Sequence, residues 1–234
     1  MNTYEYSVAP ENIDFKGQIT VPSLCRDIVN AIGQNIRVEG YGIDVMARDR
    51  RSWVLLRSAF EIDSRPGLYA PLRITVWPVA SGGITYNRCV RVTGSDGREV
   101  GRGTTEWCII DIDSRRPLFP ELGLTDSGME IPCRSPKRIR DFSADFSDNR
   151  IIRYSDCDFN GHLNNTRYLE MMYDMLPEDA IDGDSPVRID LNYRHEARRG
   201  EDISLGLKRG SGGECLFYAK SSDVTLCSAS LTRS

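Results

Sequence analysis

The sequence predicts an α+β protein with two similar halves, each built from one helix and an antiparallel sheet. Three observations lead to this fold class: two stretches with helical periodicity, several strand-like segments between turn residues, and a short motif that occurs before both helices. A chain of 234 residues is long enough for one large domain or two of ordinary size, so the number of units has to be inferred from the sequence pattern rather than from the length.

The first helical pattern lies close to the N-terminus. Apolar residues recur at three- and four-residue spacing between 24 and 32. Pro22 suits the first turn of a helix, and Gly33 is placed to end it. We therefore expect a helix that stops at Gly33.

A second helical pattern begins after residue 164. Its apolar stripe runs from Tyr168 to Leu176 at the spacing of one helix face. Asn164 or Asn165 can cap its start, and Pro177 stops it.

The remaining regular structure is predicted to be strands. The segments lie at 53–62, 72–79, 84–92 and 98–111 in the first half, and at 187–193, 202–208, 214–220 and 223–231 in the second. The sequence G-S-D-G at 94–97 favours a hairpin turn between two of them.

The segment at 114–148 is rich in Pro, Arg, Ser and Asp, which indicates a connection rather than a core element. We expect an N-terminal unit at 1–117, a linker at 118–148 and a C-terminal unit at 149–234.

Composition argues against several classes of function. The chain is 40% hydrophobic and 27% charged with a net charge of −4, whereas a dedicated nucleic-acid binder needs a basic excess. The first residues have neither a basic start nor an apolar run, and no stretch approaches the roughly 18 apolar residues of a membrane span. We therefore expect a cytoplasmic protein with no membrane span and no nucleic-acid partner.

The residues that usually hold metals are few. The 7 cysteines are odd in number, scattered and never spaced C-x-x-C, so neither a disulfide framework nor a zinc site is indicated. The 2 histidines, His162 and His195, leave little for a transition metal. No metal and no cofactor are expected.

A short motif occurs once before each helix. Residues 14–19 read D-F-K-G-Q-I and residues 158–163 read D-F-N-G-H-L, and the helical stripes then follow in step. Such a match suggests a duplicated unit. His162 in the second copy faces Gln18 in the first, and this difference points to chemistry in the second copy only.

The second copy of the motif has the residue types of an acyl-transfer site. His162 can move a proton near neutral pH, and Asp158 or Asn160 can orient its ring. Gly161 lets a substrate approach the main chain, and N–H groups near Gly161 and His162 are expected to bind an oxyanion.

A nucleophile is harder to identify. The pattern G-x-S-x-G is absent, and Cys157 has no recognisable partner. A polarised water or a carboxylate is the alternative, and Glu196 supplies a second carboxylate. Structural interpretations compete with these: an Asx-turn and helix cap for the motif, and a solvated surface carboxylate for Glu196. The D-C-D sequence at 156–158 also resembles the D-x-D of metal-dependent transferases, without their nucleotide-sugar machinery.

The sequence resembles the acyl-ACP thioesterase family, which is known from plant plastids and bacteria. The resemblance covers nearly the whole chain and rests on W-V-L-L-R (53–57), I-T-V-W-P (74–78), the strand with Glu106 and Trp107, S-R-R-P (114–117), S-D-C-D-F-N-G-H-L-N-N (155–165) with Tyr168, and Y-R-H-E (193–196). It implies two tandem hotdog units, each a long helix wrapped by an antiparallel sheet.

The resemblance also implies an activity, which is hydrolysis of the thioester between a fatty acyl chain and the phosphopantetheine arm of acyl carrier protein (ACP). The family's catalytic residues fall on Asp158, Asn160, His162 and Glu196, and we expect Glu196 within a few ångströms of His162. Many plant members have cysteine after that glutamate, whereas this chain has Ala197, so a cysteine nucleophile is not expected. Activation of water and direct attack by Asp158 both stay open.

Further expectations follow from the resemblance. The N-terminal unit, with its degenerate motif, is expected to bind the acyl chain between helix and sheet, in a bacterial cytosolic enzyme. One of two basic clusters is expected to receive the acidic carrier protein: Arg134, Lys137, Arg138 and Arg140, or Arg194, Arg198 and Arg199. An acyl-CoA thioesterase, a non-catalytic acyl-binding protein and a hotdog dehydratase are the alternatives, and a homodimer is compatible with the sequence.

Overall fold

The computed structural model describes residues 1–80, 83–119, 122–123, 126–181 and 186–233. It divides into two compact units, Met1–Ser135 and Pro136–Ser234. Within the described residues, no helix combines the length and the apolar character needed to cross a membrane.

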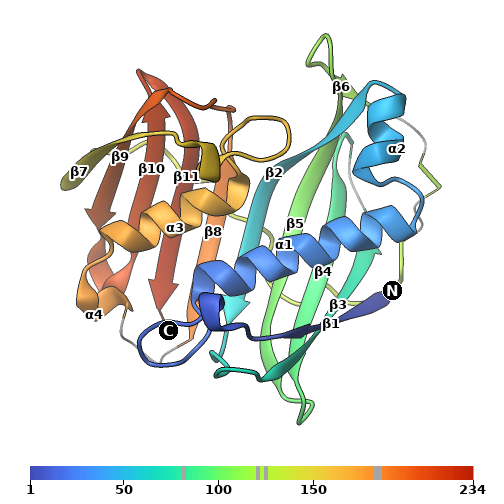
Figure 1. The fold of residues 1–234 in the computed structure, drawn as a ribbon, viewed down its shortest axis with the longest axis horizontal. Coiled ribbons are helices and arrows are strands. Elements are labelled where there is room, and N and C mark those ends of the chain that lie inside the picture. The colour runs from blue at the N-terminus through green and yellow to red at the C-terminus, as the bar shows by residue number, and fades with distance from the viewer. Residues whose placement is uncertain (81–82, 120–121, 124–125, 182–185, 234) are drawn as a thin grey trace. The chain divides into compact units, whose positions relative to one another are not determined.

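The N-terminal unit is an antiparallel sheet with a long helix on one face (Figure 1). Its elements are β1 (Asn2–Ser7), η1 (Pro10–Asn12), α1 (Val21–Val38), α2 (Ile43–Arg48), β2 (Arg51–Ile62), β3 (Pro71–Val79), β4 (Tyr86–Gly94), β5 (Glu99–Asp111) and β6 (Pro117–Leu118). The strand order is β1-β3-β4-β5-β2, and β6 pairs with β5. Helix α1 contacts β1 and β3.

The C-terminal unit repeats this arrangement on a smaller scale. Its elements are β7 (Phe146–Ile151), η2 (Tyr154–Asp156), α3 (Asn165–Met175), α4 (Glu178–Ile181), β8 (Val187–Tyr193), β9 (Asp202–Arg209), η3 (Ser211–Gly213), β10 (Cys215–Ser221) and β11 (Val224–Arg233). The strand order β7-β9-β10-β11-β8 matches the order in the N-terminal unit strand for strand, and α3 contacts β9 and β11. The predicted α+β fold with two similar helix-and-sheet units is therefore confirmed.

Helix α1 is longer than predicted. It begins as expected, with Thr20 as N-cap accepting the N–H of Ser23 at 3.2 Å, but it continues through Gly33 to Val38. The expected stop at Gly33 is therefore wrong. The buried stripe continues with Ile36, which is 4% exposed, and this burial outweighs the cost of about 1 kcal/mol for a glycine inside a helix.

Helix α3 has the predicted ends. Its N-cap is Asn164, whose side chain accepts the N–H of Thr166 at 3.0 Å, and its last residue, Met175, precedes Pro177. The predicted hairpin at 94–97 is also present, because Gly97 takes a φ of 77° and its N–H donates to the carbonyl of Gly94 at 3.1 Å.

All the predicted strands are present, whereas β1 and β7 have no counterpart among the predictions. Both are edge strands of their sheets, and both consist largely of polar or exposed residues. Such sequences lack the apolar alternation by which a strand is recognised.

The segment at 114–148 is fixed to strand β8 around residues 137–139. The backbone N–H groups of Lys137 and Ile139 donate to the side chains of Asp190 and Asn192 at 2.9 and 3.1 Å. Asn192 in turn donates to the carbonyl of Lys137 at 2.9 Å. Asp190 and Asn192 are buried in β8 and therefore need hydrogen-bond partners. The backbone at 137–139 supplies these partners.

Candidate active site

The motif at 158–162 forms a closed turn before helix α3. The N–H of Asp158 donates to the carbonyl of His162 at 2.8 Å, and the N–H of Gly161 donates to the carbonyl of Asp158 at 3.0 Å. The Oδ1 atom of Asp158 accepts the N–H groups of Asn160 and His162 at 2.8 and 3.1 Å. Gly161 has a φ of 74°, which favours glycine. Asp158 thus organises an Asx-type turn, as the structural interpretation of the motif predicts.

His162, on this turn, lies beside Glu196, on the segment that follows strand β8. The Nδ1 atom of His162 is 3.5 Å from Oε2 of Glu196, and the side chains are 14% and 41% exposed. The backbone fixes this contact, because the N–H of Leu163 donates to the carbonyl of Ala197 at 2.8 Å and His162 forms a β-bridge with Arg198. The expected proximity of the imidazole and the carboxylate is confirmed.

This pair can perform general acid–base chemistry. A carboxylate near Nδ1 favours the tautomer that carries its proton there, and this leaves Nε2 free to accept a proton from water. Asn160 is exposed on the same turn. Among the described residues, no group of three or more His, Cys, Asp or Glu side chains is arranged to hold a metal ion.

The expected oxyanion donors are engaged elsewhere. The N–H groups of Gly161 and His162 both donate to Asp158 within the turn, so the expectation that they bind the oxyanion is wrong. The physical reason is that a closed turn uses the N–H groups that an open helix start leaves unpaired. Helix α3 itself starts only at Asn165.

Cys157 shows no sign of being an activated nucleophile. Its thiol is half-buried and donates to the carbonyl of Arg153 at 3.4 Å. A thiol becomes nucleophilic beside a base or a positive charge that favours the thiolate, and a backbone carbonyl is neither.

The N-terminal unit contains the same turn without the histidine. The N–H of Asp14 donates to the carbonyl of Gln18 at 2.9 Å, and the N–H of Gly17 donates to the carbonyl of Asp14 at 2.9 Å. The Oδ1 atom of Asp14 accepts the N–H groups of Lys16 and Gln18 at 2.9 and 3.2 Å. Gly17 has a φ of 73°.

An arginine takes the place of the glutamate in this unit. The N–H of Ile19 donates to the carbonyl of Pro66 at 2.8 Å, which repeats the backbone bond that follows His162. Arg65, one residue before Pro66, therefore stands where Glu196 stands in the C-terminal unit. The sequence repeat does not reveal this match, because the number of residues between turn and partner differs between the units.

Arg65 forms an ion pair and a hydrogen bond with side chains of the N-terminal turn. Its guanidinium contacts Oδ2 of Asp14 at 2.5 Å and Oε1 of Gln18 at 2.9 Å. Burial acts to raise the pKa of Asp14, but the hydrogen bonds from Arg65, Gln18 and Lys16 outweigh it and hold that pKa below its ordinary value. We call the set Asp14, Gln18 and Arg65 the charged clasp.

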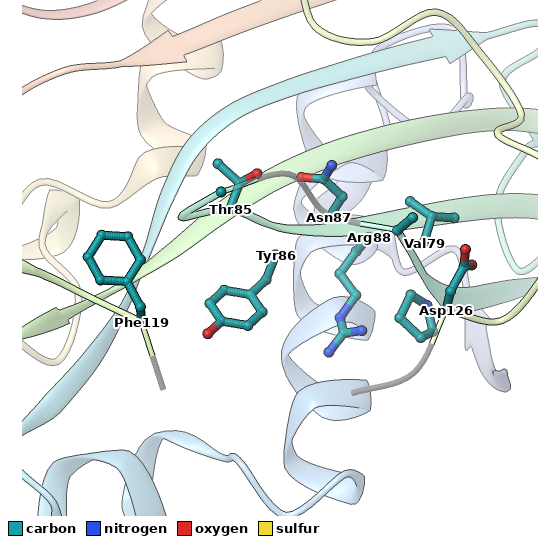
Figure 2. A pocket seen from close by; sticks show the side chains of 10 residues that line it. Val79, Thr85, Tyr86, Asn87, Arg88, Phe119 and Asp126 are labelled. Atoms are coloured by element: carbon teal, nitrogen blue, oxygen red, sulfur yellow. The ribbon is translucent and has the colours of Figure 1, made fainter. Parts of the chain in front are cut away.

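A cavity of about 280 Å³ lies in the N-terminal unit (Figure 2). It is lined by Pro78, Val79, Ala80, Gly83, Thr85, Tyr86, Asn87, Arg88, Phe119 and Asp126. Figure 2 shows Tyr86 and Arg88 on one side of β4 and Asn87 on the other. Arg88 is 2% exposed and contacts Glu39, the C-cap of α1, at 2.5 Å.

The wall of this cavity is not wholly apolar. Burial lowers the pKa of Arg88 and raises that of Glu39, because both charged groups have lost water. The cavity therefore differs from the dry tunnel expected for an acyl chain, and α1 contributes no residue to its lining.

Comparison with known proteins identifies relatives for both units. Family models of the acyl-ACP thioesterase N-terminal domain and C-terminal domain match residues 1–119 and 140–228. Oleoyl-acyl carrier protein thioesterase 2 of Arabidopsis thaliana is 24% identical over 204 residues, covering 79% of this chain and 55% of the relative. Dodecanoyl-[acyl-carrier-protein] hydrolase of Cinnamomum camphora is 22% identical over 189 residues, covering 75% and 49%. The chain spans about half the length of these curated relatives.

Solved structures with the same fold cover the chain almost completely. A crystal structure of an acyl-ACP thioesterase from Bacteroides thetaiotaomicron has a TM-score of 0.91 and 25% identity, covering 100% of this chain and 97% of its own. The 12:0-ACP thioesterase of Umbellularia californica has a TM-score of 0.85 and 16% identity, covering 99% and 96%. The family models match both units of the chain, so the chain belongs to the acyl-ACP thioesterase family.

Proposed function

We propose that the chain hydrolyses the thioester between a fatty acyl group and the phosphopantetheine arm of ACP. The reaction releases a free fatty acid and ends chain elongation on that carrier. The contact of 3.5 Å between Glu196 and His162, which stands on the turn closed by Asp158, supports this proposal most directly. Membership of the acyl-ACP thioesterase family supplies the substrate class.

In the proposed mechanism, water attacks the carbonyl carbon of the thioester. Glu196 orients the imidazole through Nδ1, and Nε2 of His162 takes the proton of the attacking water. The tetrahedral intermediate then collapses, the C–S bond breaks, and the same proton passes to the leaving thiolate. The carboxamide of Asn160, exposed on the turn, is the proposed donor to the carbonyl oxygen.

Asp158 is assigned a positioning role. Its Oδ1 atom already accepts two N–H groups of the turn and thereby holds the backbone of Asn160 and His162. An asparagine can accept the same two bonds through its own Oδ1. Asp158→Asn should therefore retain most of the turnover, whereas direct attack by the carboxylate would require a loss of several orders of magnitude.

The other sequence expectations remain predictions. Binding of the acyl chain by the N-terminal unit, a cytoplasmic location and a homodimer are consistent with the proposal. The acyl chain needs apolar contact along its length, and the buried apolar face of α1, with Leu24, Ile28 and Ile32, offers such residues.

Release of free fatty acid from a panel of acyl-ACPs tests the proposed activity. Glu196→Gln keeps the size of the side chain but removes its charge, and we expect kcat to fall about 10²-fold. His195→Gln is the matched control, because His195 is an exposed neighbour outside the proposed site and should leave kcat unchanged. Absence of fatty acid release from every acyl-ACP would refute the proposal. Faster turnover of acyl-CoA would replace it with the acyl-CoA thioesterase alternative.

A further inference from the structure

Arginines surround the proposed active site in the C-terminal unit. Arg198 pairs with His162 in a β-bridge, and Arg199 follows directly. The N–H of Gly200 donates to the carbonyl of Ile152 at 2.9 Å, which brings Arg153 next to this segment. Backbone hydrogen bonds around His162 therefore fix the main chain at Arg153, Arg198 and Arg199.

These arginines are available for a partner. Arg153, Arg198 and Arg199 are all exposed, and no carboxylate of the described residues forms an ion pair with any of their guanidinium groups. Glu201 accepts the backbone N–H of Arg198 at 3.0 Å rather than its side chain. By contrast, Arg194 contacts Asp141 at 3.1 Å, so this member of the predicted basic cluster is already paired.

Two exposed aromatic side chains accompany the arginines. Tyr154 is 80% exposed and Phe159, on the turn at 158–162, is 69% exposed. The guanidinium of Arg199 lies over the ring of Tyr154, 5.9 Å from its centroid. A surface of cations and exposed aromatic rings is typical of protein interfaces, where arginine and tyrosine are enriched.

The N-terminal unit provides an internal control for this arrangement. There, the N–H of Tyr69 donates to the carbonyl of Val8 at 2.9 Å, which repeats the bond between Gly200 and Ile152. The residues at the positions of Arg153, Arg198 and Arg199 are Ala9, Gly67 and Leu68. The same backbone therefore carries none of these cations in the unit that lacks the histidine, so the turn itself does not require them.

We propose that Arg153, Tyr154, Phe159, Arg198 and Arg199, together called the carrier face, dock the acidic carrier protein that delivers the acyl chain. This proposal rests on the proposed hydrolysis of acyl-ACP. The charge on the face is complementary to that partner, and the exposure of the guanidinium groups suits recognition of a protein surface. Docking at this place presents the pantetheine arm to His162.

The experiment compares Arg153→Glu/Arg199→Glu with Arg138→Glu/Arg140→Glu. The control pair carries the same charge change on exposed arginines of the other predicted basic cluster. Each protein is assayed with acyl-ACP, acyl-CoA and the acyl thioester of N-acetylcysteamine, which has neither carrier nor phosphate. For the carrier-face variant, we expect kcat/KM on acyl-ACP, relative to that on the N-acetylcysteamine thioester, to fall at least about tenfold. The control pair should change this ratio less than about twofold.

Three outcomes would overturn the proposal. Equal losses on all three substrates would mean that the arginines support the active site rather than docking. Equal losses on acyl-ACP and acyl-CoA would assign them to a phosphate of the substrate. No change on any substrate would leave the face without a role in binding.

Binding of holo-ACP, which has no thioester, gives the same comparison without turnover. Titration of the unsubstituted chain and of the two double variants should show weaker binding for the carrier-face variant only. Failure of the proposed hydrolysis would appear as absence of fatty acid release by the unsubstituted chain, which this titration does not depend on. The two proposals can therefore fail separately.

Discussion

The two turns that precede α1 and α3 have the same backbone and different side chains. Asp14 and Asp158 each accept two N–H groups of their own turn, and Gly17 and Gly161 each take a positive φ. These shared residues are explained by the shape of the turn alone. The residues that differ between the copies carry the information about function.

The partners of the two turns have opposite charge. Arg65 binds the carboxylate of Asp14 in the N-terminal unit, whereas Glu196 lies beside His162 in the C-terminal unit. The first arrangement pairs the carboxylate of Asp14 with a guanidinium and has no group that transfers protons at neutral pH. The second places a titratable group next to a carboxylate, which general acid–base chemistry requires.

The largest effect is expected from making the second turn resemble the first. His162→Gln should lower kcat on acyl-ACP by about 10²- to 10⁴-fold, because glutamine cannot accept the proton of water. Gln18→His is the reciprocal change and should leave kcat unaltered. Fatty acid release and a thermal melt of each variant provide the measurement. Near-normal turnover by a folded His162→Gln protein would exclude the imidazole from the mechanism.

The charged clasp should matter for stability rather than for turnover. Arg65→Ala leaves the Oδ2 atom of Asp14 partly buried without its hydrogen-bond donor, at an expected cost of about 1–3 kcal/mol. Glu196→Ala removes a more exposed side chain and should change stability by less than about 0.5 kcal/mol. Urea unfolding measures the loss of unfolding free energy in each variant. Equal losses would show that Arg65 does not contribute more to stability than Glu196.

Replacing Gly17 or Gly161 by alanine should lower the stability of the protein by the same amount. An added Cβ meets no atom within 4 Å at Gly17 or at Gly161, so Gly17→Ala and Gly161→Ala pay only for the positive φ, about 1 kcal/mol each. Only Gly161→Ala should also reduce kcat, because it shifts the backbone of His162. Thermal melts and turnover together test this; a fall in kcat for Gly17→Ala would contradict the division of roles.

The smallest effect concerns acid stability. The folded-state pKa of Asp14 is lowered, so its contribution is fully present above the ordinary carboxylate pKa and is lost as pH falls through the lowered value. The melting temperature of Asp14→Asn should therefore lie below that of the unsubstituted chain at neutral pH, and the gap should narrow in acid. A gap that stays constant with pH would mean that the charge of Asp14 does not contribute.

The sequence predicts most of the fold because most elements have an apolar face. The strands that bury one side and the stripes of α1 and α3 follow the periods of two and of three to four residues. Strands β1 and β7 lie at sheet edges and have polar sequences, so no period reveals them. At Gly33 the local signal is misleading: glycine favours the end of a helix, but the burial of Ile36 stabilises the further turn of α1.

The candidate site is predictable in its residues but not in its bonds. The motif identifies His162, and the contact with Glu196 is confirmed. The oxyanion donors were misassigned because hydrogen bonds inside a turn depend on φ and ψ, which the letters D-F-N-G-H do not specify. The role of Arg65 was missed because it becomes visible only when backbone bonds, rather than residue numbers, are aligned.

The presence of both turns in one polypeptide has a consequence for symmetry. In an assembly of two identical subunits, symmetry forces every substitution to appear in both copies. A single chain that contains two copies of the unit is free of this constraint, so one copy can carry the charged clasp while the other carries the histidine and its carboxylate. An assembly of identical subunits cannot specialise its two sites in this way.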